Sequence, residues 1–136
     1  MRCGLNPTYD DVVAEVKEYL AAQATMLEAA GVSRGRICLD PGPGFGKTPS
    51  QTLELMRNFH EFSRLGYPTM CAVSRKRYIG EAYGIADAGE RDAASAAEAL
   101  MACELGASVV RAHNVEETMK SLADLRPYAL IVLGSN

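Results

Sequence analysis

The chain has 136 residues, of which 48% are hydrophobic and 23% are charged, and its formal net charge at pH 7 is −3. These values are typical of a globular protein, and we expect residues 1–136 to form a single domain with its own core. The acidic balance argues against nucleic acid as a partner, and no apolar run approaches the roughly 20 residues of a membrane span. Because no basic and apolar leader opens the chain, we expect a cytoplasmic protein without a membrane partner.

The four cysteines lie far apart and form none of the close pairs that zinc or redox sites need. We therefore expect reduced thiols and no metal site made by this chain. Cys38 and Cys71 fall inside apolar runs, where cysteine behaves as a small hydrophobic residue.

The first half of the chain predicts two helices and two strands. One helix begins at residue 10 or 11, has acidic residues in its first turn, and ends by Gly31. A buried strand is predicted over residues 37–39, a second helix from Thr48 or Ser50 to residue 65, and a second strand over residues 67–73. Apolar residues at helical spacing in these two helices are Val12, Val13, Val16, Tyr19, Leu20, Met26 and Leu27, then Leu53, Met56, Phe59 and Phe62.

The second half continues the alternation of helices and strands. It predicts a short helical turn over residues 78–83, a loop over 84–89 and an alanine-rich helix from residue 90 or 91 to 105. A third strand over residues 107–110 and a helix over 115–125 follow. The apolar residues 128–133 either extend that helix after a kink or cover the bottom of the core. The order implies an α/β fold with parallel strands and right-handed crossovers.

Polar side chains follow each predicted strand. They are Asp40 after the first, Ser74, Arg75 and Lys76 after the second, and Arg111 with His113 after the third. Because the carboxyl ends of parallel strands share one edge of the sheet, these residues are expected to form one site.

Each of these residues also has an ordinary structural role open to it. Asp40 could cap its own turn, and Arg75 and Lys76 could be surface cations. Arg111 and His113 alternate along an extended segment and together suit an anion. His60 has no such neighbours, and we expect it at the surface or in packing.

Residues 39–48 read LDPGPGFGKT and end in the Gly-Lys-Thr of a phosphate-binding P-loop. Pro41 stands where that motif needs its first glycine, and proline has neither the amide hydrogen nor the backbone freedom required. The P-loop is therefore excluded. The glycines instead let the backbone pass close to a flat ligand, against which Phe45 can lie.

Three motifs resemble the dihydropteroate synthase family of folate biosynthesis. Residues 39–48 look like its glycine-rich strand-six motif, and SRK at 74–76, followed by Ile79 and Gly80, looks like its strand-seven motif. The Arg-x-His of residues 111–113 is similar to its strand-eight motif. The resemblance runs from about Tyr9 to residue 125, over the C-terminal part of the family's fold only.

This resemblance implies a partial (β/α)₈ barrel with the last three strand–helix units and the helix before them. A whole barrel needs roughly 250 residues. The implied reaction condenses 7,8-dihydropterin-6-ylmethyl pyrophosphate with p-aminobenzoate, giving dihydropteroate and pyrophosphate, and sulfonamides target this family. The missing strands would hold the ligand for Mg²⁺, the expected cofactor. We expect the isolated chain to be weakly active or inactive, and to form a homodimer because its sheet edges are open.

The resemblance also implies a role for each residue at the strand ends. Asp40 would bind the pterin edge and stabilise positive charge, and Lys76 would bind the pterin carbonyl near the amine nucleophile. The p-aminobenzoate would lie on Gly44, Phe45 and Ser74. Arg111 would lie against the pterin and reach a phosphate, and His113 would bind the pyrophosphate, with Arg75 as a further substrate-binding cation.

The chain departs from the family pattern at three positions. Asn114 stands where an Asp usually follows the His, Ala72 where Gly is common, and Arg77 where a smaller residue is often found. Two other function classes stay open: a methyltetrahydrofolate methyltransferase-type pterin domain, and a non-catalytic fragment for anion binding or assembly.

Overall fold

The computed structural model describes residues 8–123 and 131–134. Their helices are α1 (Val12–Ala29), α2 (Pro49–Arg57), α3 (His60–Ser63), α4 (Arg77–Tyr83), α5 (Asp92–Glu104) and α6 (Val115–Ser121), with 3₁₀ turns η1 (Arg34–Arg36) and η2 (Ala88–Arg91). Within these residues, no helix is both long and apolar enough to cross a membrane. Residues 1–7 and the predicted end of the last helix, near residue 125, lie outside the described part.

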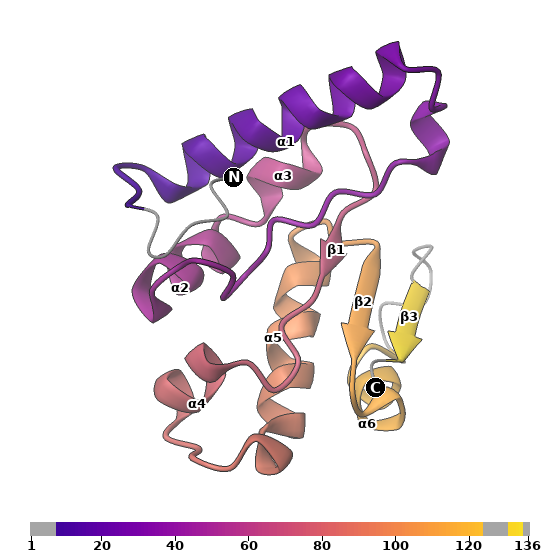
Figure 1. Ribbon diagram of the computed structural model, residues 1–136. Helices are drawn as coiled ribbons and strands as arrows, with labels where there is room; N and C mark the ends of the chain where they lie inside the picture. Colours follow the sequence, from indigo (N-terminus) through magenta and orange to yellow (C-terminus); the bar gives the residue numbers. More distant parts are fainter. Residues whose placement is uncertain (1–7, 124–130, 135–136) are drawn as a thin grey trace.

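Three parallel strands form the centre of the fold, in the order β1 (Met70–Cys71), β2 (Val109–Ala112) and β3 (Ile131–Gly134) (Figure 1). A parallel bridge between Leu39 and Thr69 lies beyond β1. The expected α/β fold with parallel strands is therefore confirmed, and the carboxyl ends of the strands point the same way (Figure 1).

The predicted strands differ from the observed ones in length and number. The strand expected over residues 37–39 is reduced to the single bridge at Leu39, and the one over 67–73 to that bridge and two residues of β1. For the part described, the extension of the last helix over residues 128–133 was wrong, because Ile131–Gly134 is a strand beside β2, whereas Val132 does pack against the core. A buried apolar run does not reveal whether a neighbouring strand is available to pair with it.

The helix expected over residues 48–65 is two helices, α2 and α3. The break falls at Asn58, whose side-chain amide donates to the carbonyl of Glu54 at 2.9 Å. The rings of Phe59 and Phe62 then pack edge to face at 6.0 Å between centroids, and both are fully buried. Both rings therefore lie in one core, as their spacing of three residues predicted.

The core lies between the helices and the sheet. Its largest fully buried side chains are Phe59, Phe62, Leu55, Met56, Ile79, Leu122, Val73 and Val110. The apolar stripe of α1 is only partly covered: Val12 and Val16 are buried, whereas Met26 and Leu27 are exposed. Cys71 is buried as predicted, but Cys38 is exposed, because the neighbours Ile37 and Leu39 face the core and Cys38 faces the other way.

Candidate active site

The structure brings the predicted strand ends into contact. The ammonium of Lys76, after β1, donates to the carbonyl of Pro43 in the loop that follows Leu39. The hydroxyl of Ser74 accepts a hydrogen bond from the backbone N–H of His113 at 3.0 Å and lies 2.9 Å from its Nδ1. The loop after Leu39, the turn after β1 and the end of β2 therefore meet at one edge of the sheet.

The loop over residues 40–48 is held by its own residues. An oxygen of Asp40 accepts from the N–H of Gly42 at 2.8 Å, and Lys47 donates to the carbonyls of Gly42 and Phe45 at 3.0 and 3.1 Å. Gly44 has a φ of 77°, in the left-handed region that favours glycine. The contact to Gly42 shows that Asp40 does cap its turn, and the same carboxylate lies exposed at the sheet edge.

Phe45 is exposed on this loop, and Lys76, from the turn after β1, lies beside it. The Phe45 side chain is 67% exposed, and the Lys76 ammonium lies 5.7 Å from the centre of its ring. Burial lowers the pKa of Lys76, and Arg111 acts in the same direction, whereas Asp40 opposes the shift. The arrangement offers a flat apolar surface beside a cation that burial makes easier to deprotonate.

Arg111 and His113 extend from the end of β2 to the same side. Both residues are exposed, and Ala112 between them is buried, which agrees with the predicted alternation. Nδ1 of His113 is hydrogen-bonded to the Ser74 hydroxyl, and Nε2 lies on the opposite side of the ring. A cation and an imidazole at a strand end can bind an anion.

Comparison with known protein families identifies the chain. The model of the family described as "Pterin binding enzyme" matches residues 1–113. The chain belongs to this family. It is 47% identical over 119 residues to the dihydropteroate synthase of Neisseria meningitidis serogroup C, covering 87% of this chain and 42% of that protein.

Solved structures of pterin-binding enzymes show the same fold. A Xanthomonas albilineans dihydropteroate synthase with 4-aminobenzoic acid matches 93% of this chain with a TM-score of 0.88 and 37% identity. The same enzyme in complex with 7,8-dihydropteroate matches 89% with a TM-score of 0.86 and 38% identity. The chain covers 46% of each of these structures, so it spans less than half of the enzymes that it resembles.

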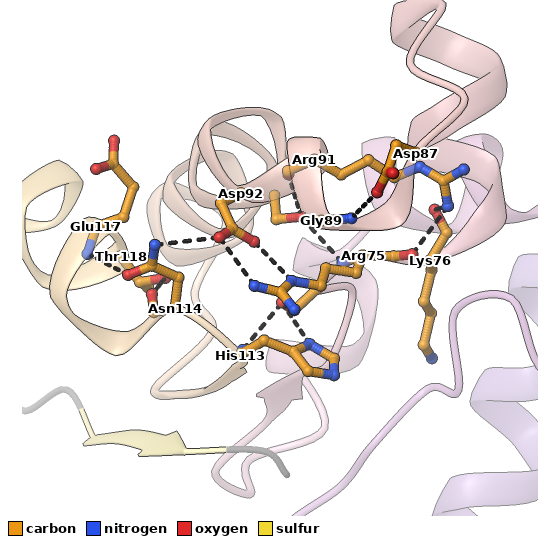
Figure 2. A network of polar contacts seen from close by, with 12 residues as sticks. Arg75, Lys76, Asp87, Gly89, Arg91, Asp92, His113, Asn114, Glu117 and Thr118 are labelled. Carbon is orange, nitrogen blue, oxygen red and sulfur yellow. Dashed lines mark hydrogen bonds and ion pairs between the residues drawn. The ribbon is translucent and has the colours of Figure 1, made fainter.

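One residue of the predicted site, Arg75, makes contacts of a different kind. The guanidinium of Arg75 forms a bidentate ion pair with Asp92, with Nε and Nη2 at 2.8 and 3.0 Å from the carboxylate oxygens (Figure 2). The direct binding of substrate by Arg75 stays a prediction. Asp92 itself was missed, because an acid in the first turn of a helix is explained well enough by the helix dipole.

Proposed function

We propose that this chain supplies the C-terminal part of the active site of a dihydropteroate synthase, built on a partial barrel. The reaction joins 7,8-dihydropterin-6-ylmethyl pyrophosphate to p-aminobenzoate. The bond from the methylene carbon to the pyrophosphate oxygen breaks, the amine nitrogen bonds to that carbon, and the amine loses a proton. The main support is that Lys76 contacts the loop after Asp40 and Ser74 contacts His113 at one sheet edge, in a chain whose relatives are dihydropteroate synthases.

Asp40 is proposed to stabilise the developing cation. As pyrophosphate leaves, positive charge spreads from the methylene carbon into the pterin ring, and a fixed carboxylate at the ring edge lowers the energy of that state. Asp40 is held by the N–H of Gly42, so its position is set before the substrate arrives. This pre-organisation means that little reorganisation accompanies the reaction.

Lys76 and the 40–48 loop are proposed to hold the second substrate beside the first. Lys76 donates to the pterin carbonyl, while Phe45, Gly44 and Ser74 form the surface for p-aminobenzoate. The exposed ring of Phe45 suits an aromatic ligand, since offset stacking needs an open face. The ammonium of Lys76, 5.7 Å from that ring, lies where the pterin and the amine would meet.

Arg111 and His113 are proposed to bind the leaving pyrophosphate. Both are exposed on the same side of the β2 end, and a guanidinium fork matches the oxygens of a phosphate. Fixed donors at this point stabilise the negative charge of the leaving group. In the described residues, no three His, Cys, Asp or Glu side chains gather into a metal-binding group, and the expected Mg²⁺ enters no step here.

The chain covers less than half of its relatives, so further strands are needed to complete the barrel. A homodimer, a cytoplasmic location, sulfonamide binding and weak activity of the isolated chain are parts of the same proposal. In the described residues β1 and β3 are the outer strands of the sheet, and the backbone donors and acceptors of an outer strand support association.

The proposal is tested by titrating the purified chain with the pterin pyrophosphate in a calorimeter. We expect saturable binding that Asp40→Asn removes. The control is Asp10→Asn, which makes the same change of charge at an exposed residue just before α1. A folded chain that does not bind, or an Asp40→Asn variant that binds as well as the original chain, would contradict the assignment of the pterin site to these residues.

A further inference from the structure

The turn over residues 74–76 is anchored by α5. Arg75 has a φ of 60°, and it alone among the described non-glycine residues has a positive φ. This left-handed conformation is strained for an L-residue, so surrounding contacts must hold it. One such contact is the Arg75 N–H, which donates to the hydroxyl of Ser95 at 3.0 Å, and that hydroxyl donates to the carbonyl of Arg91 at 2.6 Å.

Arg91 holds the same turn through its side chain. Its Nη1 donates to the carbonyl of Arg75 at 3.0 Å and lies 3.4 Å from that of Lys76. Its other nitrogens donate to the carbonyls of Ile85 and Ala86 at 3.0 and 2.6 Å. A single guanidinium therefore joins the 74–76 turn to the segment between α4 and α5 (Figure 2).

Asp92 connects the turn to the end of β2. Its carboxylate receives the fork of Arg75 and also the side-chain amide of Asn114, at 3.1 Å from Nδ2. The amide oxygen of Asn114 is occupied by the N–H of Glu117, where it caps α6. The amide orientation is thus fixed at both ends (Figure 2).

Asn114 and Asp92 form a matched pair. An Asp at position 114 could still accept from the N–H of Glu117, but it would place a second carboxylate about 3 Å from that of Asp92. Only the amide can both accept at the helix and donate to the acid. The Asn114 departure from the family pattern therefore accompanies an acid supplied by α5.

We propose that Arg91 and Asp92 are positioning residues of the site, and that the Arg75–Asp92–Asn114 network holds Lys76 and His113 in their relative places. In this network the Arg75 guanidinium acts through its ion pair with Asp92. The chain of contacts is continuous, from Lys76 through the turn to Asp92, and from Asn114 to its neighbour His113, which the Ser74 hydroxyl also binds. The inference rests on the proposed function, because it describes how Lys76 and His113, two residues proposed to bind substrate, are held.

A charge exchange between positions 92 and 114 tests the network in the full chain. The variants are Asp92→Asn, Asn114→Asp and the double variant, which again has one acid and one amide. Hydrogen exchange of the Arg75 and His113 backbone amides is followed by NMR, relative to amides within α5. We expect exchange to be about tenfold faster in each single variant and to return to within about threefold of the original in the double variant.

The matched control is Glu116→Gln, which removes one charge from the exposed Glu116–Lys120 pair within α6. It should leave the exchange rates of both amides unchanged. Unchanged exchange in the single variants, or effects that add in the double variant, would overturn the proposal. If one single variant does not fold, the other single variant and the double variant decide: a folded double variant with normal exchange supports the pairing, and unaltered exchange in the remaining single variant refutes it.

Ligand binding gives a second readout that a purely structural role would not change. At a temperature well below unfolding, we expect Asp92→Asn to weaken binding of the pterin pyrophosphate about tenfold and the double variant to recover it. Equal affinity in a folded Asp92→Asn chain would contradict positioning. A chain that never binds this ligand would contradict the proposed function, whereas the exchange measurement would still decide the network.

Discussion

Two segments meet at the proposed site and are held in different ways. The 40–48 loop makes most of its contacts with itself, through Asp40, Lys47 and the Thr48 cap of α2. The 74–76 turn makes its contacts with residues far away in the sequence, at separations of 17 for Arg75 with Asp92 and 39 for Ser74 with His113. The conformation of the 40–48 loop depends mainly on residues close to it in the sequence. The conformation of the 74–76 turn forms only when α5 and β2 have packed against it.

This difference has a functional consequence. The Phe45 ring and the Asp40 carboxylate lie on one short segment with several hydrogen bonds of its own. The relative position of Lys76 and His113 depends on the start of α5, which is distant in sequence and lies outside the motifs. Substitutions in the two segments should therefore differ in how much they change stability and ligand binding.

The largest effect is expected for Arg91→Ala. This change removes the donor to the carbonyls of Arg75, Ile85 and Ala86 and leaves backbone groups of the turn without a partner. We expect the free energy of unfolding, measured in urea, to fall by about 3 kcal/mol. Arg77→Ala is the control, since Arg77 is 78% exposed and pairs with Glu81 one turn away; its expected cost is below about 0.5 kcal/mol. Equal losses would show that Arg91 does not hold the turn.

A smaller effect is expected from acid, through Asp92. The hydrogen bond from Arg75 lowers the pKa of the Asp92 carboxyl below its ordinary 3.8, and the bond from Asn114 acts in the same direction. A lowered pKa in the folded state stabilises the fold above the ordinary pKa, and this contribution is lost as the pH falls through the folded value. The melting temperature of the chain should exceed that of Asp92→Asn by a constant amount above about pH 5, and this difference should shrink as the pH falls below 3.8. A gap that does not change with pH would contradict the ion pair.

The smallest change in stability is expected in the 40–48 loop, for Gly44→Ala. Gly44 and Gly31 both have a positive φ, of 77° and 93°, so alanine should cost about 1 kcal/mol at either position. A Cβ at Gly31 meets nothing within 4 Å, whereas one at Gly44 lies 3.2 Å from Cδ of Lys76. Binding of the pterin pyrophosphate should weaken in Gly44→Ala and stay unchanged in Gly31→Ala. Equal binding by the two variants would show that Gly44 is not part of the binding site.

Several parts of the fold and site could be predicted from the sequence because their causes are local. The start of α1 at Val12 follows from Asp11, whose side chain accepts from the N–H of Ala14. The Thr48 cap and the exposure of Arg111 and His113 on either side of Ala112 follow from residue type and spacing in the same way. The grouping of polar residues at strand ends needed only the rule that parallel strands end at one edge.

Other features were decided by tertiary structure. The break between α2 and α3, the strand Ile131–Gly134 and the exposure of Cys38 depend on which elements pack together, and a residue pattern alone does not specify its partners. The bond of Arg75 to Asp92 belongs to the same group. Either residue reads as an ordinary surface charge in the sequence, and only the docking of α5 against the sheet places a carboxylate 2.8 Å from the Arg75 guanidinium and orients both.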